Sequence, residues 1–281
     1  MLTEVQGRGD LAIKDTAMRR YLTLLAMVTI ARFYRCDGPC VPISSWAIVK
    51  KCKSMNLTEA ATMAFIASKT NIPVPHVYCS FIRKNSTYII MERIPGKTLA
   101  AAWPGLSDLE RENILMRLRS IVRELRALPP PDQAVQSCVG GSLRDSRIPR
   151  PQPRFGPFRS ILAFHYWLRE GLQLEQCLDH KNDDKWTEIR RMIVMQDREP
   201  APPVFTHGDL NPFNILVRDG QIVAIIDWEF SGWYPFYWEY TSAWLGNKTR
   251  QAWQNLIPKF IDPCPEELEM EAIRQKWWGD F

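Results

Sequence analysis

The stretch HGDLNPFNILVRDGQIVAIID at residues 207–227 decides how this chain folds and where its chemistry lies. Two short apolar runs, at residues 215–217 and 222–226, flank the dipeptide Asp219-Gly220. Aspartate followed by glycine tolerates the positive φ angles of a type I′ turn, which joins two antiparallel strands directly. The stretch therefore predicts a tight β-hairpin.

The hairpin determines which polar side chains come together. The cross-strand pairs of a two-residue loop are Arg218 with Gln221, Leu216 with Val223, and Asn214 with Ile225. Because side chains alternate between the two faces of a strand, Asn214 and Asp227 then share one face. Such diagonal neighbours lie about 7–8 Å apart. An amide oxygen and a carboxylate so placed could hold a hard cation such as Mg²⁺.

Two further polar residues precede the hairpin. Asp209 lies five residues before Asn214, in the loop that leads into the first strand, and His207 lies two residues earlier. A second carboxylate in this loop is free to face the same site. The spacing predicts a site for a metal-assisted reaction.

Bulk properties exclude several classes of protein. The chain has 281 residues, 46% hydrophobic and 24% charged, which is ordinary for a globular protein with one large domain or two lobes. Its seven cysteines are scattered and form no CxxC pair, so a reducing compartment is expected rather than a disulfide framework or a zinc site. We expect a cytoplasmic protein.

Charge and hydropathy argue against two kinds of partner. Residues 207–281 hold 6 Lys and Arg against 11 Asp and Glu, and the remainder holds 30 against 20. The arginines of that basic part gather in a proline-rich loop, not along a helix or an aromatic strand, so we expect no nucleic-acid partner. The apolar run at residues 21–33 is shorter than the roughly 20 residues of a membrane-spanning helix, so we expect a buried helix and no membrane partner.

The first third of the chain predicts a small strand-rich lobe. Two helices are expected, at residues 14–32 and 57–69, the second with Asn56 as its N-cap and Glu59 at its third position. Four strands are expected at residues 41–43, 46–51, 77–82 and 87–91, the last two joined at Lys84-Asn85.

The remainder predicts a larger helical lobe. Ser107 and Glu110 form a capping box that opens an amphipathic helix reaching residue 128. A loop at residues 129–159, rich in proline and arginine, is long enough to serve as a lid or docking loop. Helices at residues 160–178 and 183–197, the hairpin and an aromatic helical tail follow.

The motif HGDLNPFN followed by IIDWE resembles that of aminoglycoside phosphotransferases and choline kinases. The stretches RFYRCDGPCVPIS, EAATMAFIASKTNIPVPHVY, GGSLRDSRIPR and RQKWWGDF resemble a fungal branch of that family. The resemblance implies an α+β, bilobal, protein-kinase-like fold with a small β-rich N-lobe and a larger, mainly helical C-lobe. We place the nucleotide-binding lobe, with its N-terminal helix, at residues 1–94 and the catalytic, substrate-binding lobe at 95–281.

The resemblance also implies roles for the motif residues. Asp209 is similar to the catalytic base, His207 to the residue that braces its loop, and Asn214 and Asp227 to the metal ligands. Met91 looks like the gatekeeper, and the backbone of residues Glu92 to Ile94 like the hinge that binds adenine. The implied cofactors are ATP and Mg²⁺, and the implied reaction moves the γ-phosphate to a hydroxyl of a small molecule.

A lysine of the small lobe should anchor the α and β phosphates. Lys50 ends the strand sequence AIVK, which resembles the kinase VAIK motif, and Lys51 is the alternative on the opposite face. Family likeness pairs Glu59 with Lys50, although a glutamate in a first helical turn can also serve only as a cap. We expect the ion pair, because a lysine that faces phosphates needs orienting.

One feature departs from the family pattern. No glycine-rich loop precedes Lys50: only Gly38 and a distant Gly7 and Gly9 are present. Backbone amides approach phosphates most closely where glycines permit it. A catalytically weak or silent nucleotide-binding or scaffold protein therefore stays open as the alternative.

A protein kinase fits less well, because DWE replaces DFG, no APE occurs, and only 54 residues follow Asp227. Glu229 is open between a further metal-site carboxylate and a surface charge, with the surface favoured. The glutamates of the C-terminal run are expected to be a solvated helix face: Glu266, Glu267, Glu269 and Glu271. We expect a monomer or a weak dimer.

Overall fold

A computed structural model describes residues 9–34, 38–53, 56–177 and 184–279, so Gly7 and Cys36 lie outside the described residues. The backbone divides into two compact units. Unit 1 comprises residues 1–114 and 212–229, and unit 2 comprises residues 115–211 and 230–281. The hairpin thus belongs to unit 1 although it lies late in the chain. The functional division after residue 94 stays a prediction.

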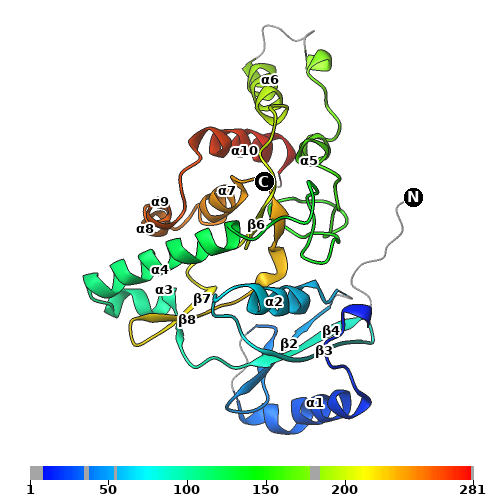
Figure 1. Cartoon of the computed structure of the whole chain (residues 1–281), viewed down its shortest axis with the longest axis vertical. Helices are drawn as coiled ribbons and strands as arrows, with labels where there is room; N and C mark the ends of the chain where they lie inside the picture. The colour runs from blue at the N-terminus through cyan, green and yellow to red at the C-terminus, as the bar shows by residue number, and fades with distance from the viewer. Residues whose placement is uncertain (1–8, 35–37, 54–55, 178–183, 280–281) are drawn as a thin grey trace. The chain divides into compact units, whose positions relative to one another are not determined.

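Unit 1 is built on a four-stranded antiparallel sheet with the order β1-β2-β4-β3 (Figure 1). The strands are β1 (Cys40–Pro42), β2 (Ala47–Cys52), β3 (Val77–Arg83) and β4 (Ser86–Glu92). In the turn between β3 and β4, Lys84 and Asn85 have φ angles of 47° and 55°, as a type I′ hairpin requires. All four predicted strands are confirmed, with ends shifted by one residue.

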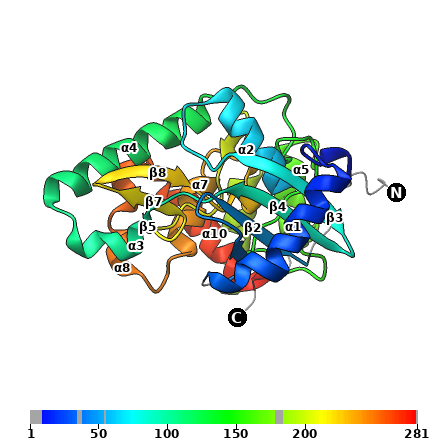
Figure 2. The same cartoon turned by 90° about the horizontal axis from the view of Figure 1, so that it is seen from below.

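Two helices cover opposite faces of this sheet, α1 (Ala17–Thr29) and α2 (Thr58–Lys69) (Figures 1 and 2). On the α1 face, Leu24 and Met27 pack against a buried cluster that contains Val49, Cys79, Phe81, Tyr88 and Ile90. Because neighbouring residues of a strand point to opposite faces, Lys50 points away from this cluster and toward α2.

Both helices begin later than expected, whereas α2 ends at Lys69 as predicted. The expected helix at residues 14–32 begins at Ala17 and continues as the 3₁₀ helix η2 (Ile30–Phe33). It is buried on one face only, so the expectation of a buried helix is wrong for its outer face. The N-cap of α2 is Leu57 and not Asn56, although Asn56 Oδ1 still accepts the N–H of Thr58 at 2.7 Å.

The predicted hairpin is confirmed, and so is its predicted pair of Arg218 with Gln221, but the register predicted farther from the turn is wrong. It consists of β7 (Ile215–Arg218) and β8 (Gln221–Ile225), and β5 (Lys97–Thr98) pairs with β7. Asp219 and Gly220 have φ angles of 50° and 71°. The observed pairs beyond the turn are Val217 with Ile222, Leu216 with Ala224, and Ile215 with Ile225. Val223 is the extra residue of a β-bulge, which a count of residues from the turn cannot show.

Unit 2 is mainly helical. Its longer helices are the later part of α4 (Asp108–Arg126), α5 (Ile161–Leu168), α6 (Asp184–Gln196), α7 (Trp238–Leu245) and α10 (Pro265–Trp278). The two-stranded sheet pairs β6 (Val204–Thr206) with β9 (Gly232–Tyr234). The short elements of both units are η1 (Gly9–Leu11), α3 (Leu99–Ala102), η3 (Trp103–Gly105), η4 (Glu175–Cys177), η5 (Trp228–Phe230), α8 (Gln251–Gln254) and α9 (Ile257–Phe260).

Capping and turn residues in the sequence correctly predicted most helix boundaries between residues 107 and 197. The capping box is present: Ser107 Oγ accepts the N–H of Glu110 at 3.3 Å, and Glu110 Oε2 accepts that of Ser107 at 2.8 Å. The helix expected at residues 160–178 is wrong in length. It ends at Leu168, because Glu170 and Gly171 adopt positive φ angles of 57° and 79° that stop a right-handed helix.

Isolated β-bridges order the long loop at residues 129–159. Val135 with Phe158 and Leu143 with Phe155 are bridges inside the loop, and Gln136 with Trp233 joins it to β9. Its role as a lid or docking loop stays a prediction. Among the described residues, no helix has both the length and the apolar content that crossing a bilayer requires.

Replacing Gly220 by alanine should lower the free energy of unfolding by about 1–2 kcal/mol, the cost of a left-handed conformation for a residue with a Cβ. A Cβ there would also lie 2.6 Å from Glu110 Oε1, which belongs to the capping box. Urea denaturation followed by far-ultraviolet circular dichroism measures the change. Gly105→Ala is the control, since its Cβ meets no atom within 4 Å. Equal losses in both variants would contradict the assignment.

Candidate functional site

A buried lysine in unit 1 is held between two carboxylates. Lys50 Nζ lies 2.8 Å from Glu59 Oε1 and 2.7 Å from Asp227 Oδ1. The expected pair of Lys50 and Glu59 is therefore confirmed, and Lys50 rather than Lys51 points into this cluster. The contact with Asp227 joins residues that are 177 positions apart in the sequence.

Three local features bring these groups together. The alternation of β2 directs Lys50 to the α2 face of the sheet. Glu59 occupies the first turn of α2, where a carboxylate also interacts favourably with the helix dipole. Asp227 follows β8 by two residues and has a φ of 64°, so the backbone turns sharply there.

Electrostatics keep the lysine charged. Burial lowers the pKa of Lys50, but attraction to Glu59 and Asp227 outweighs it, and the net pKa is raised. Burial raises the pKa of the Glu59 carboxyl, and Lys50 opposes that shift. Asp227 is more exposed than either partner, with 35% of its side chain accessible. Asp227 is therefore the carboxylate of this cluster that a ligand can reach.

Glu229 joins the same cluster. One carboxylate oxygen from each of Glu59, Asp227 and Glu229 lies within 4.8 Å of the others. Glu229 is half-buried, and η5 places its carboxylate near that of Asp227, so its role as a metal-site carboxylate or a surface charge stays a prediction. Carboxylate oxygens are the ligands that Mg²⁺ prefers, so the donor set fits a hard cation.

Asn214 stands at the start of β7 and is buried. Its backbone oxygen accepts the N–H of Ile226 at 2.9 Å, which continues the hairpin beyond β8. The prediction that Asn214 and Asp227 are diagonal neighbours assumed a hairpin without a bulge. The bulge changes that register, and the backbone of Asp227 is not extended. The roles of Asn214 and Asp227 as metal ligands stay predictions.

The predicted hinge follows β4. Met91 is buried in the sheet opposite Ile48 and Val77. The backbone N–H of Glu92 donates to His76 O at 2.9 Å, and that of Arg93 donates to Trp46 O at 2.9 Å. Of the predicted hinge residues, all of which the structure describes, Ile94 is the one whose N–H forms no hydrogen bond. Adenine recognition by these residues stays a prediction.

In unit 2, His207 and Asp209 form a short polar loop after β6. The N–H of Asp209 donates to His207 Nδ1 at 3.2 Å, and His207 is fully buried. Asn211 Nδ2 donates to Asp209 Oδ1 at 2.8 Å. These bonds hold the Asp209 carboxylate in one orientation, as a positioned base requires. The catalytic roles of His207 and Asp209 stay predictions.

Glu239 of α7 supports this loop and was missed in the sequence. Its carboxylate accepts the N–H of His207 at 2.6 Å and that of Gly208 at 3.3 Å. Burial raises the pKa of Glu239 to about 7, while the two backbone donors and Arg126 lower it. A single carboxylate in the otherwise apolar stretch of residues 236–245 is the signal that could have identified it.

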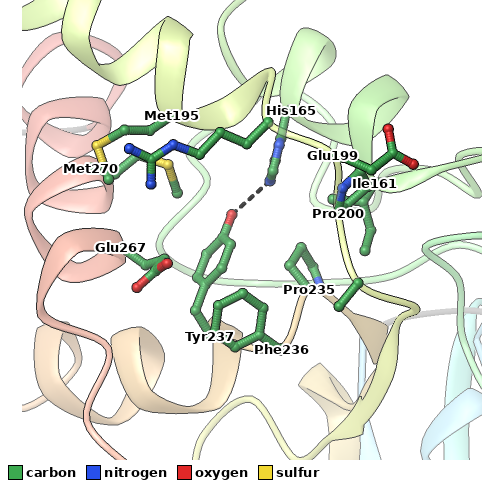
Figure 3. A pocket seen from close by; sticks show the side chains of 12 residues that line it. Ile161, His165, Met195, Glu199, Pro200, Pro235, Phe236, Tyr237, Glu267 and Met270 are labelled. Carbon is green, nitrogen blue, oxygen red and sulfur yellow. Dashed lines mark hydrogen bonds between the residues drawn. The ribbon is translucent and has the colours of Figure 1, made fainter.

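Unit 2 also contains a small hollow, which other residues line (Figure 3). It has a volume of about 130 Å³, and His165, Phe236 and Tyr237 are among its lining side chains. His165 Nε2 lies 2.8 Å from the Tyr237 hydroxyl, and Nδ1 lies 2.7 Å from Gln196 O. Ligand pockets usually measure about 300–1,000 Å³. This hollow is too small for a nucleotide, and its His165 side chain is held by Tyr237 and Gln196.

The model of the phosphotransferase enzyme family matches residues 55–262, which is most of the chain. The chain belongs to this family. The match includes the HGDLNPFN and IIDWE motifs and Glu239. The match begins after Lys50, and the structure connects Lys50 to the matched segment through its contacts with Glu59 and Asp227.

Solved structures show the same kinase-like fold. A thermostable mutant of aminoglycoside phosphotransferase APH(4)-Ia with AMP-PNP and hygromycin B is 13% identical, covers 86% of this chain and 81% of its own, and has a TM-score of 0.55. The gentamicin complex of APH(2″)-IIa is 13% identical, covers 94% and 87%, and has a TM-score of 0.53. APH(3″)-Id from Streptomyces rimosus, with ADP and streptomycin, is 13% identical, covers 92% and 99%, and has a TM-score of 0.52.

Two curated relatives match a shorter segment. They are subtelomeric hrmA-associated cluster proteins of two Aspergillus fumigatus strains, 32% identical over 72 residues. The match covers 24% of this chain and spans only 14% of the length of each relative.

Replacing Lys50 by alanine should lower the free energy of unfolding by about 3 kcal/mol, because it leaves the buried Glu59 carboxylate without its cation. Lys51→Ala is the matched control. Lys51 is exposed, with its ammonium group 5.6 Å from the centre of the Tyr88 ring, so its loss should cost less than about 1 kcal/mol. Equilibrium unfolding in urea distinguishes the two. Similar losses in both variants would contradict the buried pairing.

Replacing Glu239 by alanine should free the loop of His207 and Asp209, because two buried N–H groups lose their acceptor at a cost of about 1–3 kcal/mol. Hydrogen exchange measured by mass spectrometry should show faster exchange in a peptide that contains residues 207 and 208. Glu267→Ala, on α10, is the control. Unchanged protection of that peptide in Glu239→Ala would contradict the supporting role.

Proposed function

We propose that this chain is an ATP- and Mg²⁺-dependent phosphotransferase that moves the γ-phosphate of ATP to a hydroxyl of a small molecule. The observation that carries the proposal is Lys50, buried and charged between Glu59 and Asp227. A cation held in this way is oriented for phosphate oxygens and is not a solvated surface charge. Family membership and the nucleotides named for the similar structures, AMP-PNP and ADP, support it.

The residues of unit 1 would bind the nucleotide. Lys50 would contact the α and β phosphates, with Glu59 fixing its position. The backbone beside Met91, Glu92 and Ile94 would contact adenine. Asn214 and Asp227 would hold Mg²⁺, with Glu229 as a further carboxylate; bound there, the ion would offset charge on the phosphate oxygens.

The loop in unit 2 would act on the acceptor. Asp209, oriented by Asn211, would accept the proton of the acceptor hydroxyl as it attacks the γ-phosphate. His207 and Glu239 would keep the loop in place through the bonds at Asp209 N, His207 N and Gly208 N. Transfer of this kind depends on positioning more than on covalent help from the protein.

The charged side chains of α10 are relevant to the chemical class of the acceptor substrate. Glu266 and Glu269 pair with Arg198 and Arg191, and Glu271 is buried beside Arg274. The expectation of a solvated face is therefore wrong for Glu271. Hygromycin B, gentamicin and streptomycin are named for the similar structures. Because arginines already neutralise these three carboxylates, α10 gives no reason to restrict the acceptor to such amines.

A nucleotide-binding protein without turnover is the second candidate, favoured by the turn between β1 and β2. This turn, at residues 43–46, contains no glycine. Ser44 Oγ accepts the N–H groups of Trp46 and Ala47 at 3.2 and 3.0 Å, and the N–H of Ser44 donates to Ala47 O. Amides that bond within the turn contribute less to phosphate binding.

The location we propose is the cytoplasm. The cysteines of the described residues are free: Cys40, Cys52, Cys79, Cys138, Cys177 and Cys264. Free thiols, three of them buried, fit a reducing compartment.

Replacing Asp209 by alanine should lower turnover about 10²–10⁴-fold, the usual contribution of a general base, while the thermal shift caused by Mg-ATP persists. Asp227→Ala should lose both turnover and the Mg²⁺-dependent part of the shift. Asp262→Ala, an exposed carboxylate on another surface, is the control. ADP release and mass spectrometry over a panel of hydroxylated metabolites measure transfer.

These measurements also separate the two candidates. No shift at millimolar Mg-ATP would contradict both. A shift without turnover on any acceptor, identical in wild type and Asp209→Ala, would support the protein without turnover. Substantial transfer by purified Asp227→Ala would contradict the metal-site assignment.

A further inference from the structure

The outer face of α1 is an apolar stripe that the rest of unit 1 does not cover. Met18, Tyr21, Leu25 and Val28 are 66%, 63%, 42% and 75% exposed. Their spacing of three, four and three residues places them on one side of the helix, as the core positions of two heptads. The inner side of the same helix is already used, because Leu24 and Met27 pack against the sheet. Helix α1 therefore has a second apolar side besides the one that packs against the sheet.

A groove adjoins this stripe. It lies between α1 and the sheet, has a volume of about 530 Å³, and is lined by Ala26 and Ile30 of the helix and by Ile43, Trp46 and Tyr78. Leu25 belongs to both the stripe and the groove. Figure 2 shows α1 lying across the sheet strands. The surface thus offers a ridge of side chains beside a hollow wide enough to accept side chains.

The area of this surface matches what a stable interface needs. The large apolar side chains exposed around α1 are Met18, Tyr21, Leu22, Leu25, Val28, Ile30, Phe33 and Trp46. At about 150–250 Å² for a large side chain, their exposed fractions amount to roughly 800 Å². A standard interface also buries about 800 Å² on each partner. Patches of this size on monomers usually mark an interaction site.

The charges of α1 favour a protein partner over a lipid surface. Within the helix the only charged residues are Arg19 and Arg20. Arg20 is neutralised by Asp15, at 2.6 Å from Nε to Oδ1, and Arg19 donates to Tyr78 O. Basic helices that bind anionic membranes carry clusters of about 4–8 Lys and Arg. The four stripe residues Met18, Tyr21, Leu25 and Val28 carry no charge, and Lys14 and Arg19 are the cationic residues that line the adjoining groove.

We propose that two copies of this chain associate through the outer face of α1, related by a two-fold axis. A ridge and a groove on the same surface are self-complementary under such an axis, since each copy supplies both. Leu25 and Val28 of one copy pack against α1 of its partner, and the stripe enters the partner's groove beside Trp46. This association is independent of the proposed phosphotransfer.

Sedimentation velocity of the full chain, from about 1 to 100 µM, tests the proposal. Wild type should form a dimer in this range, where dissociation constants correspond to about 6–8 kcal/mol of association free energy. The double variant Leu25→Asp with Val28→Asp should weaken association at least about tenfold. The control is Leu109→Asp with Met116→Asp, which changes two exposed apolar residues of α4 and should leave the dimer intact.

Other outcomes would overturn the proposal. Wild type that remains monomeric at the highest concentration would do so, and so would a dimer of equal strength in the α1 variant. Monomeric wild type that co-sediments with anionic phosphatidylserine vesicles would assign the face to lipid instead. Circular dichroism melting shows whether each variant is folded. If the double variant is not, the single variant Val28→Lys takes its place, because Val28 is 75% exposed.

Discussion

Unit 1 depends on the ion pairs that the buried ammonium group of Lys50 forms with Glu59 and Asp227. A lysine cannot remain charged in a protein interior without carboxylates beside it, because removal from water costs several kcal/mol. Glu59 and Asp227 provide them from α2 and from the end of the hairpin. The same ion pairs join β2 to α2, nine residues farther along the chain, and to the end of the hairpin, 177 residues away. It also keeps a cation oriented where the proposed reaction needs one.

Unit 2 also contains buried polar groups that need partners, and here they are backbone N–H groups. The loop of His207 and Asp209 turns sharply, and a Cβ at Gly208 would lie 2.7 Å from Phe230 O. A loop this tight leaves N–H groups that cannot reach a regular secondary-structure partner, and buried N–H groups need acceptors. The Glu239 carboxylate accepts two of them. Glu239 therefore holds the loop in place, and the Asp209 carboxylate stays available for the proposed proton transfer.

The shared fold at 13% identity with aminoglycoside phosphotransferases has a physical basis. In this chain, the requirements that unit 1 shows are an alternating apolar pattern in the strands, the pairing of Glu59 with Lys50, and a positive-φ turn in the hairpin. Many residues satisfy the first requirement, and few satisfy the others. Acceptor recognition lies outside these requirements. Surface features such as the exposed face of α1 lie outside them as well and can differ among proteins of the same fold.

The sequence by itself determined what depends on neighbouring residues. The four strands of unit 1, the Asp219-Gly220 turn and the capping box of Ser107 and Glu110 were all predicted, because turn and capping chemistry act within a few residues. The motif at residues 207–227 also indicated the family. Lys50 and Glu59 were paired correctly because a family pattern linked two elements that alternation and helix periodicity already placed.

Only the tertiary structure decided the rest. The bulge at Val223 depends on packing across the hairpin, so a count from the turn gave the wrong register for Asn214. The closeness of Glu229 to Glu59 could not be predicted, because the two residues are 170 positions apart in the sequence. Glu239 was missed for the same reason. The two apolar sides of α1 looked like one buried helix, since a pattern shows where apolar residues lie and only packing shows which of them are covered.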